Sequence, residues 1–243
     1  FKEIQFSQDV YAIWHALEAE GYSGALLSNI FAGGTVNTER AFLTGVADGN
    51  YDYRGDAPSY VRYLKGQGYR ATGSHPSYNW FYNRQNVNAY LGFDSYRFTE
   101  DYFGPVYGAD PVLNDDGFLP DLTRTVLEQL EQDAPLFSFS VTYQNHGPYE
   151  SDRARGAVFL TPEETGLSLE SCAILNNYFD GILRTIQAVE EAVQRLEEME
   201  EPVVLVLFGD HKPWSGNGNS VYQELGLDFD LSTLEGFYDY YST

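Results

Sequence analysis

Four apolar runs along the chain each lead into a polar loop that contains glycine, proline or both. Ala25–Phe31 leads into AGGT, Tyr69–Gly73 into SHP, Leu136–Thr142 into YQNHGP and Val203–Phe208 into GDHKP. Continuous apolar strands are typical of a parallel sheet that is covered by helices on both faces. The pattern therefore predicts four strands of one mainly parallel sheet.

Amphipathic segments lie between these runs. The clearest is Leu183–Met199, where apolar residues recur at steps of three and four with Glu and Gln between them, and Pro202 follows. Leu122–Leu130 and Ser59–Lys65 show the same kind of pattern. Strands that alternate with helices predict a doubly wound α/β fold. No internal boundary is evident, so residues 1–243 are expected to form a single domain.

The composition is that of a folded, acidic protein. The 243 residues are 43% hydrophobic and 16% aromatic, with a formal net charge of −22. Such a surface repels nucleic acid, which excludes DNA and RNA as expected partners. No run approaches the roughly 20 apolar residues of a membrane helix, and no signal peptide opens the sequence. We expect the chain as given to be soluble.

Histidines concentrate in the loops that follow the predicted strands. The chain has four His, of which His75, His146 and His211 are in these loops, together with Thr35 and Asp210. Ligands of open parallel sheets bind at the carboxyl ends of the strands. This distribution predicts an active site there.

Asp210 and His211, in GDHKP, offer a carboxylate and an imidazole. This pair of ligands suits Mn²⁺ or Zn²⁺ better than Ca²⁺. A turn with an incidental histidine is the alternative.

Thr35 follows two glycines and precedes a helical pattern. A helix N-terminus there would stabilise an alkoxide and a bound phosphate. The alternative is that Thr35 is only an N-cap. An alcohol nucleophile also needs a base or a metal to activate it.

The segment Trp80-Phe81-Tyr82-Asn83-Arg84 sets a guanidinium beside aromatic rings. That combination suits a phosphate, with a glycerol moiety against a ring; a solvated Arg in a surface loop is the alternative. His146 could donate a proton to a phosphate oxygen or to a leaving alkoxide, or it could be a structural histidine bonded to a carbonyl.

Five segments in this order resemble the lipoteichoic acid synthase family of the sulfatase and alkaline phosphatase superfamily. They are FAGGTVNTERAFLTG, GYRATGSHP, FYNRQNVNAYLGFD, NHGPY and GDHKP. The resemblance implies an alkaline phosphatase-like α/β domain. It also implies transfer of glycerol phosphate from phosphatidylglycerol to a growing polyglycerol-phosphate chain, with release of diacylglycerol. In the full protein it implies upstream membrane helices and a site on the extracellular face of the cell membrane.

The resemblance also implies roles for individual residues. Thr35 matches the nucleophile that becomes a phosphothreonine and also ligates the metal, and Asp210 and His211 match two further metal ligands. The implied metal is Mn²⁺, with Mg²⁺ as the alternative.

His75, Arg84 and His146 match residues that hold the glycerol-phosphate group. Tyr82 stands where relatives often have Trp and keeps the aromatic wall. We interpret His146 as the proton carrier of either transfer step.

The sequence departs from the family pattern at its ends. The family's acidic fourth metal ligand, which follows the first strand, has no counterpart in the opening FKEIQFSQDV. We therefore expect a fragment that is truncated at both ends and that has a weakened or empty metal site.

Three competing functions remain. A sulfatase would need Cys or Ser in a C/S-x-P-x-R context, which Cys172 lacks. A phosphoethanolamine transferase or a phosphodiesterase could use the same threonine and metal. A non-catalytic domain that binds teichoic acid or lipid head groups is the third.

Overall fold

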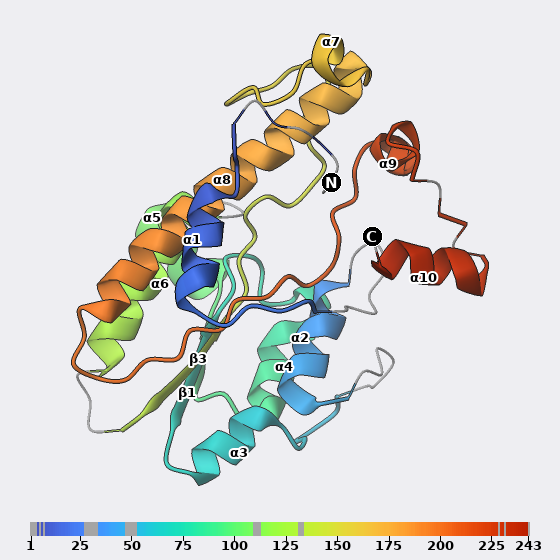
Figure 1. Cartoon of the computed structure of the whole chain (residues 1–243). Helices are drawn as coiled ribbons and strands as arrows, with labels where there is room; N and C mark the ends of the chain where they lie inside the picture. The colour runs from blue at the N-terminus through green and yellow to red at the C-terminus, as the bar shows by residue number, and fades with distance from the viewer. Residues whose placement is uncertain are drawn as a thin grey trace. The chain divides into compact units, whose positions relative to one another are not determined.

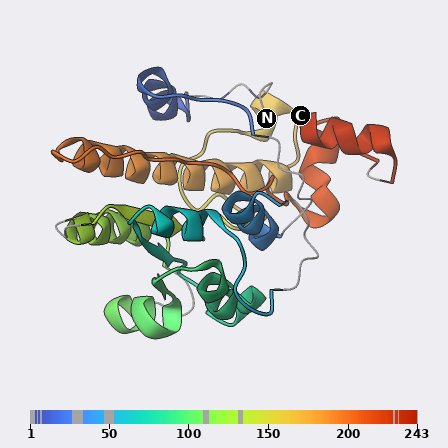
Figure 2. The same ribbon diagram turned by 90° about the horizontal axis from the view of Figure 1, so that it is seen from below.

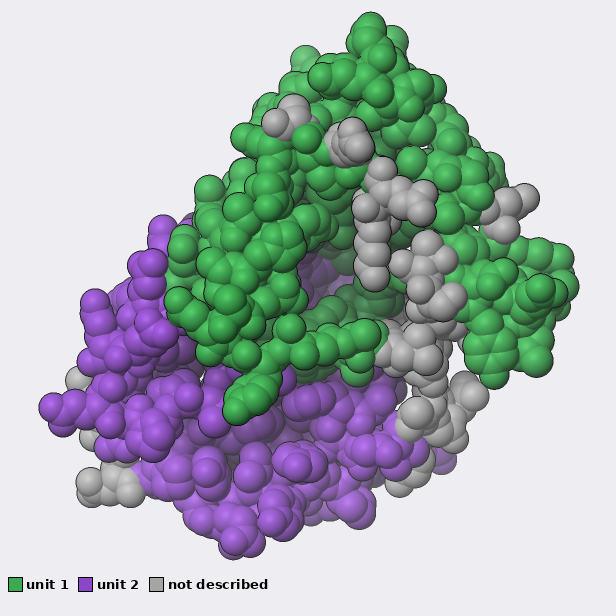
Figure 3. Space-filling model, viewed as in Figure 1, with its two compact units in different colours: residues 1–33, 145–190, 207–243 green, residues 34–144, 191–206 purple. Residues whose placement is uncertain are grey.

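The computed structural model describes residues 4, 6, 8–26, 34–46, 53–108, 113–130, 134–227, 229–230 and 232–242. The chain divides into two compact units that interleave in sequence. Unit 1 comprises residues 1–33, 145–190 and 207–243, and unit 2 comprises residues 34–144 and 191–206 (Figure 3). The expected single domain stays a prediction.

Unit 2 is built on a parallel sheet of three described strands in the order β2–β1–β3. The predicted strands around Tyr69–Gly73 and Leu136–Thr142 are confirmed as β1 (Arg70–Ser74) and β3 (Leu136–Ser140). β1 pairs with both neighbours, with Gly73 opposite Tyr96 on one side and Phe139 on the other. The third strand, β2 (Ser95–Arg97), is too short to carry an apolar run and was not predicted.

Helices cover both faces of this sheet. On one face, side chains of α2, α3 and α4 pack with the sheet around Ala71 and Phe139 (Figure 1). On the other, α6 and the sheet residues Thr72, Ser74 and Ser138 line a small polar cavity. The predicted α/β fold with a helix-flanked parallel sheet is thus confirmed. The helices of unit 2 are α2 (Thr35–Thr44), α3 (Tyr60–Gly66), η1 (Phe81–Asn83), α4 (Arg84–Leu91), η2 (Thr99–Phe103), α5 (Gly104–Tyr107) and α6 (Asp115–Leu130).

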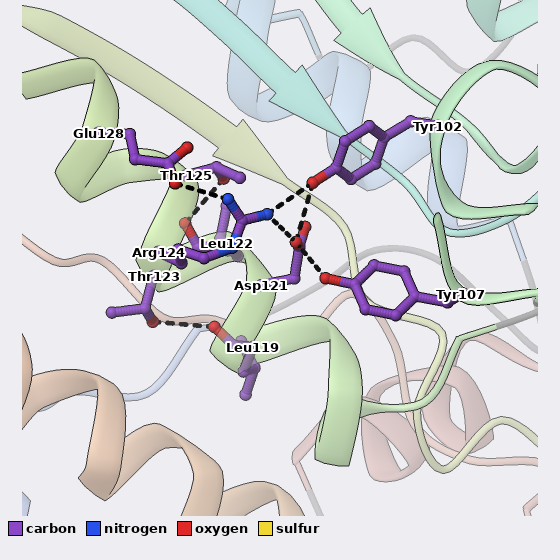
Figure 4. Close-up of polar contacts among 9 residues, drawn as sticks. All are labelled: Tyr102, Tyr107, Leu119, Asp121, Leu122, Thr123, Arg124, Thr125 and Glu128. Carbon is purple, nitrogen blue, oxygen red and sulfur yellow. Dashed lines mark hydrogen bonds and ion pairs between the residues drawn. The ribbon is translucent and has the colours of Figure 1, made fainter. Parts of the chain in front are cut away.

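A polar cluster ties the η2–α5 segment to α6 (Figure 4). The Asp121 carboxylate accepts hydrogen bonds from the hydroxyls of Tyr102 and Tyr107 and from the guanidinium of Arg124. Arg124 also pairs with Glu128 at 2.6 Å. Burial and these bonds to Asp121 raise the pKa of both tyrosines, so their hydroxyls stay protonated donors.

Unit 1 is organised by α8 (Leu169–Glu197), whose last turns belong to unit 2. The predicted helix Leu183–Met199 is confirmed, but it begins fourteen residues earlier, at Leu169. Its buried face packs Leu175 and Phe179 against Val10, Phe159 and Val221. The other helices of unit 1 are α1 (Ala12–Glu20), α7 (Pro162–Thr165), η3 (Asn217–Asn219), α9 (Ser220–Glu224) and α10 (Leu234–Ser242).

α8 is the longest helix, with 29 residues, and both views show it as one continuous element (Figure 1, Figure 2). Its second half, from Arg184 to Glu197, carries Glu and Arg between the apolar residues. Among the described residues, no helix has the length and apolar character that crossing a bilayer requires.

The predicted strand Val203–Phe208 is wrong. These residues have no regular secondary structure, and Val204 is 88% exposed. An apolar run becomes a strand only where a neighbour pairs with its backbone, and no described strand does so here. The predicted strand Ala25–Phe31 lies outside the described residues from position 27 onward.

Gly73 is required by the close approach of Tyr96. A Cβ at position 73 would collide with the Tyr96 ring and lie 2.7 Å from the Phe139 carbonyl oxygen. We expect Gly73→Ala to lower the free energy of unfolding by about 2 to 3 kcal/mol. The Tyr96 ring could move away from the added methyl group, but the Phe139 backbone could not. Urea denaturation checks this. The control is Gly66→Ala, where the added Cβ meets open space; an equal loss there would contradict the packing argument.

Candidate functional site

The predicted site residues fall into one set in each unit. Unit 2 holds Thr35, His75, Tyr82 and Arg84, which we call the Arg84 group. Unit 1 holds His146, Asp210 and His211, which we call the His211 group. The convergence of the two groups on one substrate stays a prediction.

Thr35 is the first residue of α2. The N-cap is Gly34, whose φ of 109° is left-handed and suits glycine. The alternative in which Thr35 is merely the N-cap is therefore wrong, because its side chain stands one position inside the helix. The first backbone N–H groups of a helix lack intrahelical acceptors, and the helix dipole favours anions beside them. A Thr35 alkoxide or a phosphate would be stabilised there.

His75 follows β1 and is 3% exposed. Burial lowers its pKa to about 3, and the positive charge of Arg84 acts in the same direction. The ring is therefore neutral at physiological pH. Its Nδ1 lies 3.0 Å from the Val141 carbonyl oxygen, to which a neutral ring donates its one N–H. Nε2 then carries a lone pair and can accept a hydrogen bond from a substrate hydroxyl.

The titration of His75 is a testable consequence. In the unfolded chain a His ionises near 6.5, so the unfolded state binds the proton more readily than the folded state. The contribution of His75 to stability is full above about pH 6.5 and is lost as the pH falls toward 3. We expect its ring signals in NMR to stay constant from pH 8 to pH 5, with His75→Gln identifying them. A midpoint between pH 6 and 7 would contradict this environment.

Arg84, the first residue of α4, is 2% exposed. Its Nε and Nη2 donate to the two carboxylate oxygens of Glu39, at 3.2 and 2.5 Å. Burial alone would lower the pKa of Arg84, but the bonds to Glu39 and its charge raise it overall, so the guanidinium stays charged. Nη1 is buried and has no hydrogen-bond partner among the described residues. The alternative of a solvated surface Arg is therefore wrong.

Glu39 is a buried partner of the Arg84 group that sequence reasoning missed. It is 6% exposed, although glutamate is almost never fully buried without a partner. In the segment TVNTER it follows Thr35 by one helical turn, which is the only signal that the sequence carries.

An aromatic loop adjoins Arg84. Trp80, Phe81 and Tyr82 are 65%, 44% and 41% exposed, and the Trp80 ring stacks on Tyr78 with centroids 5.5 Å apart. The Tyr82 ring lies 5.1 Å from the Arg84 guanidinium carbon, within the range of a cation–π contact. This loop presents an exposed aromatic surface beside a buried cation.

His146 is exposed and follows β3 by six residues. Its Nδ1 lies 2.6 Å from the Gly147 carbonyl oxygen. The preceding Asn145 is left-handed at φ 59° and donates to the Tyr178 carbonyl at 3.0 Å. The loop therefore anchors to α8 through Asn145, while the His146 ring stays exposed to solvent.

Asp210 and His211 lie together. The Asp210 carboxylate accepts from the His211 backbone N–H at 2.9 Å, and its other oxygen is 3.3 Å from His211 Nε2. His211 Nδ1 lies 2.8 Å from the Lys212 carbonyl oxygen. When the neutral ring donates from Nδ1, an imidazole lone pair faces a carboxylate oxygen, and these are the donor atoms that a divalent cation takes.

This arrangement fits two ligands of a metal site. No cluster of three or more His, Cys, Asp or Glu suited to a metal occurs in the part of the chain that the structure describes. The site prediction assumed that the Asp210 loop follows a strand. That assumption is wrong, because no described strand precedes this loop.

Cys172 does not resemble a sulfatase nucleophile. It lies in α8, is 4% exposed and contacts the Thr165 hydroxyl at 3.5 Å. It is therefore packed in the hydrophobic core of unit 1.

Residues 2–229 match the family described as Sulfatase, and the chain belongs to that family. The predicted resemblance to lipoteichoic acid synthases is confirmed by a match to lipoteichoic acid synthase 1 of Bacillus subtilis. The two are 25% identical over 166 residues, which are 65% of this chain and 24% of that protein.

Two further similarities extend over more of the chain. A candidate cyclic beta-1,2-glucan modification protein of Rhizobium meliloti is 30% identical over 217 residues, which are 84% of this chain and 32% of that protein. The structure of the Streptococcus pyogenes phosphoglycerol transferase GacH, in complex with sn-glycerol-1-phosphate, superposes with a TM-score of 0.68 at 21% identity. That match covers 90% of this chain and 59% of GacH. The chain spans about a third of the length of the first curated relatives that it matches.

Proposed function

We propose that this chain is part of a metal-dependent phosphoglycerol transferase. The enzyme moves glycerol phosphate from phosphatidylglycerol to a growing polyglycerol-phosphate chain through a phosphothreonine at Thr35. The observation that carries the proposal is the Arg84 group. A threonine at a helix N-terminus, a buried cation with a nitrogen left unpaired and a neutral imidazole occur in one unit. These groups match the needs of an attack on a phosphodiester.

The reaction proceeds in two in-line displacements. Thr35 Oγ first attacks phosphorus, the bond from phosphorus to the diacylglycerol oxygen breaks, and the hydroxyl proton passes to the leaving diacylglycerol. A terminal hydroxyl of the acceptor then attacks the same phosphorus, and Thr35 leaves and regains a proton. His146 is exposed and is the proposed carrier of the proton in both steps.

The remaining residues bind and orient the substrate. Arg84 offers Nη1 to a phosphate oxygen, His75 accepts from a glycerol hydroxyl through Nε2, and Tyr82 packs against the glycerol carbons. Asp210 and His211, with Thr35, would hold Mn²⁺ or alternatively Mg²⁺. When bound, such a cation supplies Lewis acidity that lowers the pKa of the Thr35 hydroxyl and offsets phosphate charge.

The proposed donor lipid determines the location of the reaction. Phosphatidylglycerol remains in a bilayer, so the catalytic domain must reach a membrane surface. The proposal therefore includes membrane anchoring of the full protein, with this domain on the extracellular face of the cell membrane.

A second candidate differs only in the acceptor. The Rhizobium meliloti relative is named for the modification of a cyclic glucan, which suggests a sugar hydroxyl as acceptor. The exposed ring of Trp80, which stacks on the partly buried ring of Tyr78, could pack against the apolar face of a sugar.

The test uses the full-length protein with vesicles of phosphatidylglycerol that carries a labelled glycerol head group. With Mn²⁺ present we expect diacylglycerol release and transfer of label to polyglycerol phosphate. Transfer to cyclic β-1,2-glucan instead would support the second acceptor. Vesicles of phosphatidylethanolamine test phosphoethanolamine transfer. Binding of head groups without diacylglycerol release would contradict the proposal and favour a non-catalytic binding domain.

A further inference from the structure

We infer that Glu39 is a positioning residue, which fixes the Arg84 guanidinium relative to the Thr35 hydroxyl. This inference rests on the proposed function, in which Glu39 has no role of its own. Glu39 touches neither substrate nor metal in this account, and it acts through Arg84.

Glu39 lies in the same helix, α2, as the proposed nucleophile. Thr35 and Glu39 are four residues apart in one helix, so their side chains lie on the same side, one turn from each other. Arg84 begins α4, 45 residues further along the chain. The ion pair therefore connects the helix that carries the nucleophile directly to the residue that binds phosphate.

The ion pair of Glu39 and Arg84 is bidentate and buried. Two parallel hydrogen bonds hold a planar guanidinium in a single orientation, which one bond or a lysine would not do. The side chains of Arg84 and Glu39 are 3% and 8% exposed, so water does not compete for these bonds. Because Nε and Nη2 are both engaged, Nη1 is the nitrogen left for a ligand, and its direction is fixed.

The next residue of α2, Arg40, makes a second contact with the segment that precedes Arg84. Arg40 donates from Nη2 to the Tyr82 carbonyl oxygen at 3.2 Å. Tyr82 and Asn83 are both left-handed, at φ 55° and 56°, which costs energy for residues other than glycine. Two consecutive residues of α2 thus fix this segment: Glu39 binds the Arg84 side chain, and Arg40 binds the left-handed backbone that precedes it.

A purely stabilising role is a weak explanation for the pair. Buried ion pairs often add little net stability, because desolvation of both charges offsets their attraction. A fixed orientation beside a nucleophile, by contrast, has a direct use in phosphoryl transfer, where displacements of about 1 Å can cost about 100-fold in rate.

The experiment compares Glu39→Gln and Glu39→Asp with the wild-type full-length protein. Turnover of phosphatidylglycerol gives kcat, and calorimetry with sn-glycerol-1-phosphate gives the dissociation constant and the stoichiometry, which counts folded sites. For Glu39→Gln we expect kcat to fall about 100-fold. The dissociation constant should change less than about threefold, because the Arg84 charge remains, and the stoichiometry should not change. Glu39→Asp keeps the charge and should recover part of kcat.

Glu128→Gln is the matched control, since it removes one glutamate from an ion pair with an arginine in the same unit. Its kcat should equal that of the wild type. A fall in stoichiometry that parallels the fall in kcat for Glu39→Gln would overturn the inference and leave a structural role only. An unchanged kcat would also overturn it. A wild-type protein without turnover would instead overturn the proposed function, and with it this inference.

Discussion

Replacement of Thr35 by alanine is expected to abolish transfer while the protein stays folded. The variant lacks the oxygen that attacks phosphorus, and loss of a nucleophile costs on the order of 10⁴-fold or more in kcat. Thr35 is the first residue of α2, where alanine is a good helix former, and Gly34 rather than Thr35 is the N-cap. The measurement is diacylglycerol release from phosphatidylglycerol vesicles, with circular dichroism for the fold.

Two variants make this result specific. Thr35→Ser keeps a hydroxyl and should retain part of the activity. Thr44→Ala removes the last threonine of the same helix, whose hydroxyl bonds to the Arg40 carbonyl oxygen, and should retain nearly all of it. Full activity in Thr35→Ala would exclude a covalent intermediate on this residue.

Loss of the Asp210 carboxylate is expected to have the second large effect. Asp210 and His211 face each other at 3.3 Å with the donor atoms that a divalent cation takes. Removal even of outer-shell partners costs metal sites about 10- to 100-fold in affinity, so loss of a ligand should cost more than about 100-fold. Calorimetry with Mn²⁺ on the full-length Asp210→Ala protein, without substrate, measures this directly.

The charge and the geometry of Asp210 can be separated. Asp210→Asn keeps an oxygen that can accept from the His211 backbone N–H but loses the negative charge, and it should bind Mn²⁺ almost as weakly as Asp210→Ala. Asp152→Ala removes an equal charge from an exposed loop of the same unit and should bind like the wild type. Equal affinity in Asp210→Ala and the wild type would exclude Asp210 as a ligand.

The sequence predicted those elements whose stabilising contacts are local or periodic. β1 and β3 are short runs that end at polar loops, and α6 and α8 show a clear 3.6-residue period. The bounds were less well predicted, because α8 starts in LESCAILNN, where buried residues occur all round the helix.

Tertiary contacts explain the two segments that the sequence did not predict correctly. Val203–Phe208 has the most strand-like composition in the chain, yet the described structure gives it no paired neighbour. β2 has only three residues and exists because Tyr96 and Arg97 pair with Gly73 and Ser74. No local pattern distinguishes either case.

The candidate site shows the same division. The sequence predicted His75 and His146 as site residues from their loops after β1 and β3, because the carboxyl ends of parallel strands share one edge of a sheet. Their shared role stays a prediction. Glu39 was missed because a glutamate in an amphipathic helix resembles a solvated residue until its partner is known. Arg84 was predicted to bind phosphate, but its burial and its bidentate partner come only from the packing of α2 against α4.

The covalent intermediate is the central claim, and one measurement tests it most directly. The full-length protein is incubated with Mn²⁺ and phosphatidylglycerol without acceptor, quenched in acid, digested and analysed by mass spectrometry. We predict one added glycerol phosphate on the peptide that contains Thr35. The adduct should be absent from Thr35→Ala and should be lost when polyglycerol phosphate is added. Diacylglycerol release from phosphatidylglycerol without any adduct on that peptide would contradict it.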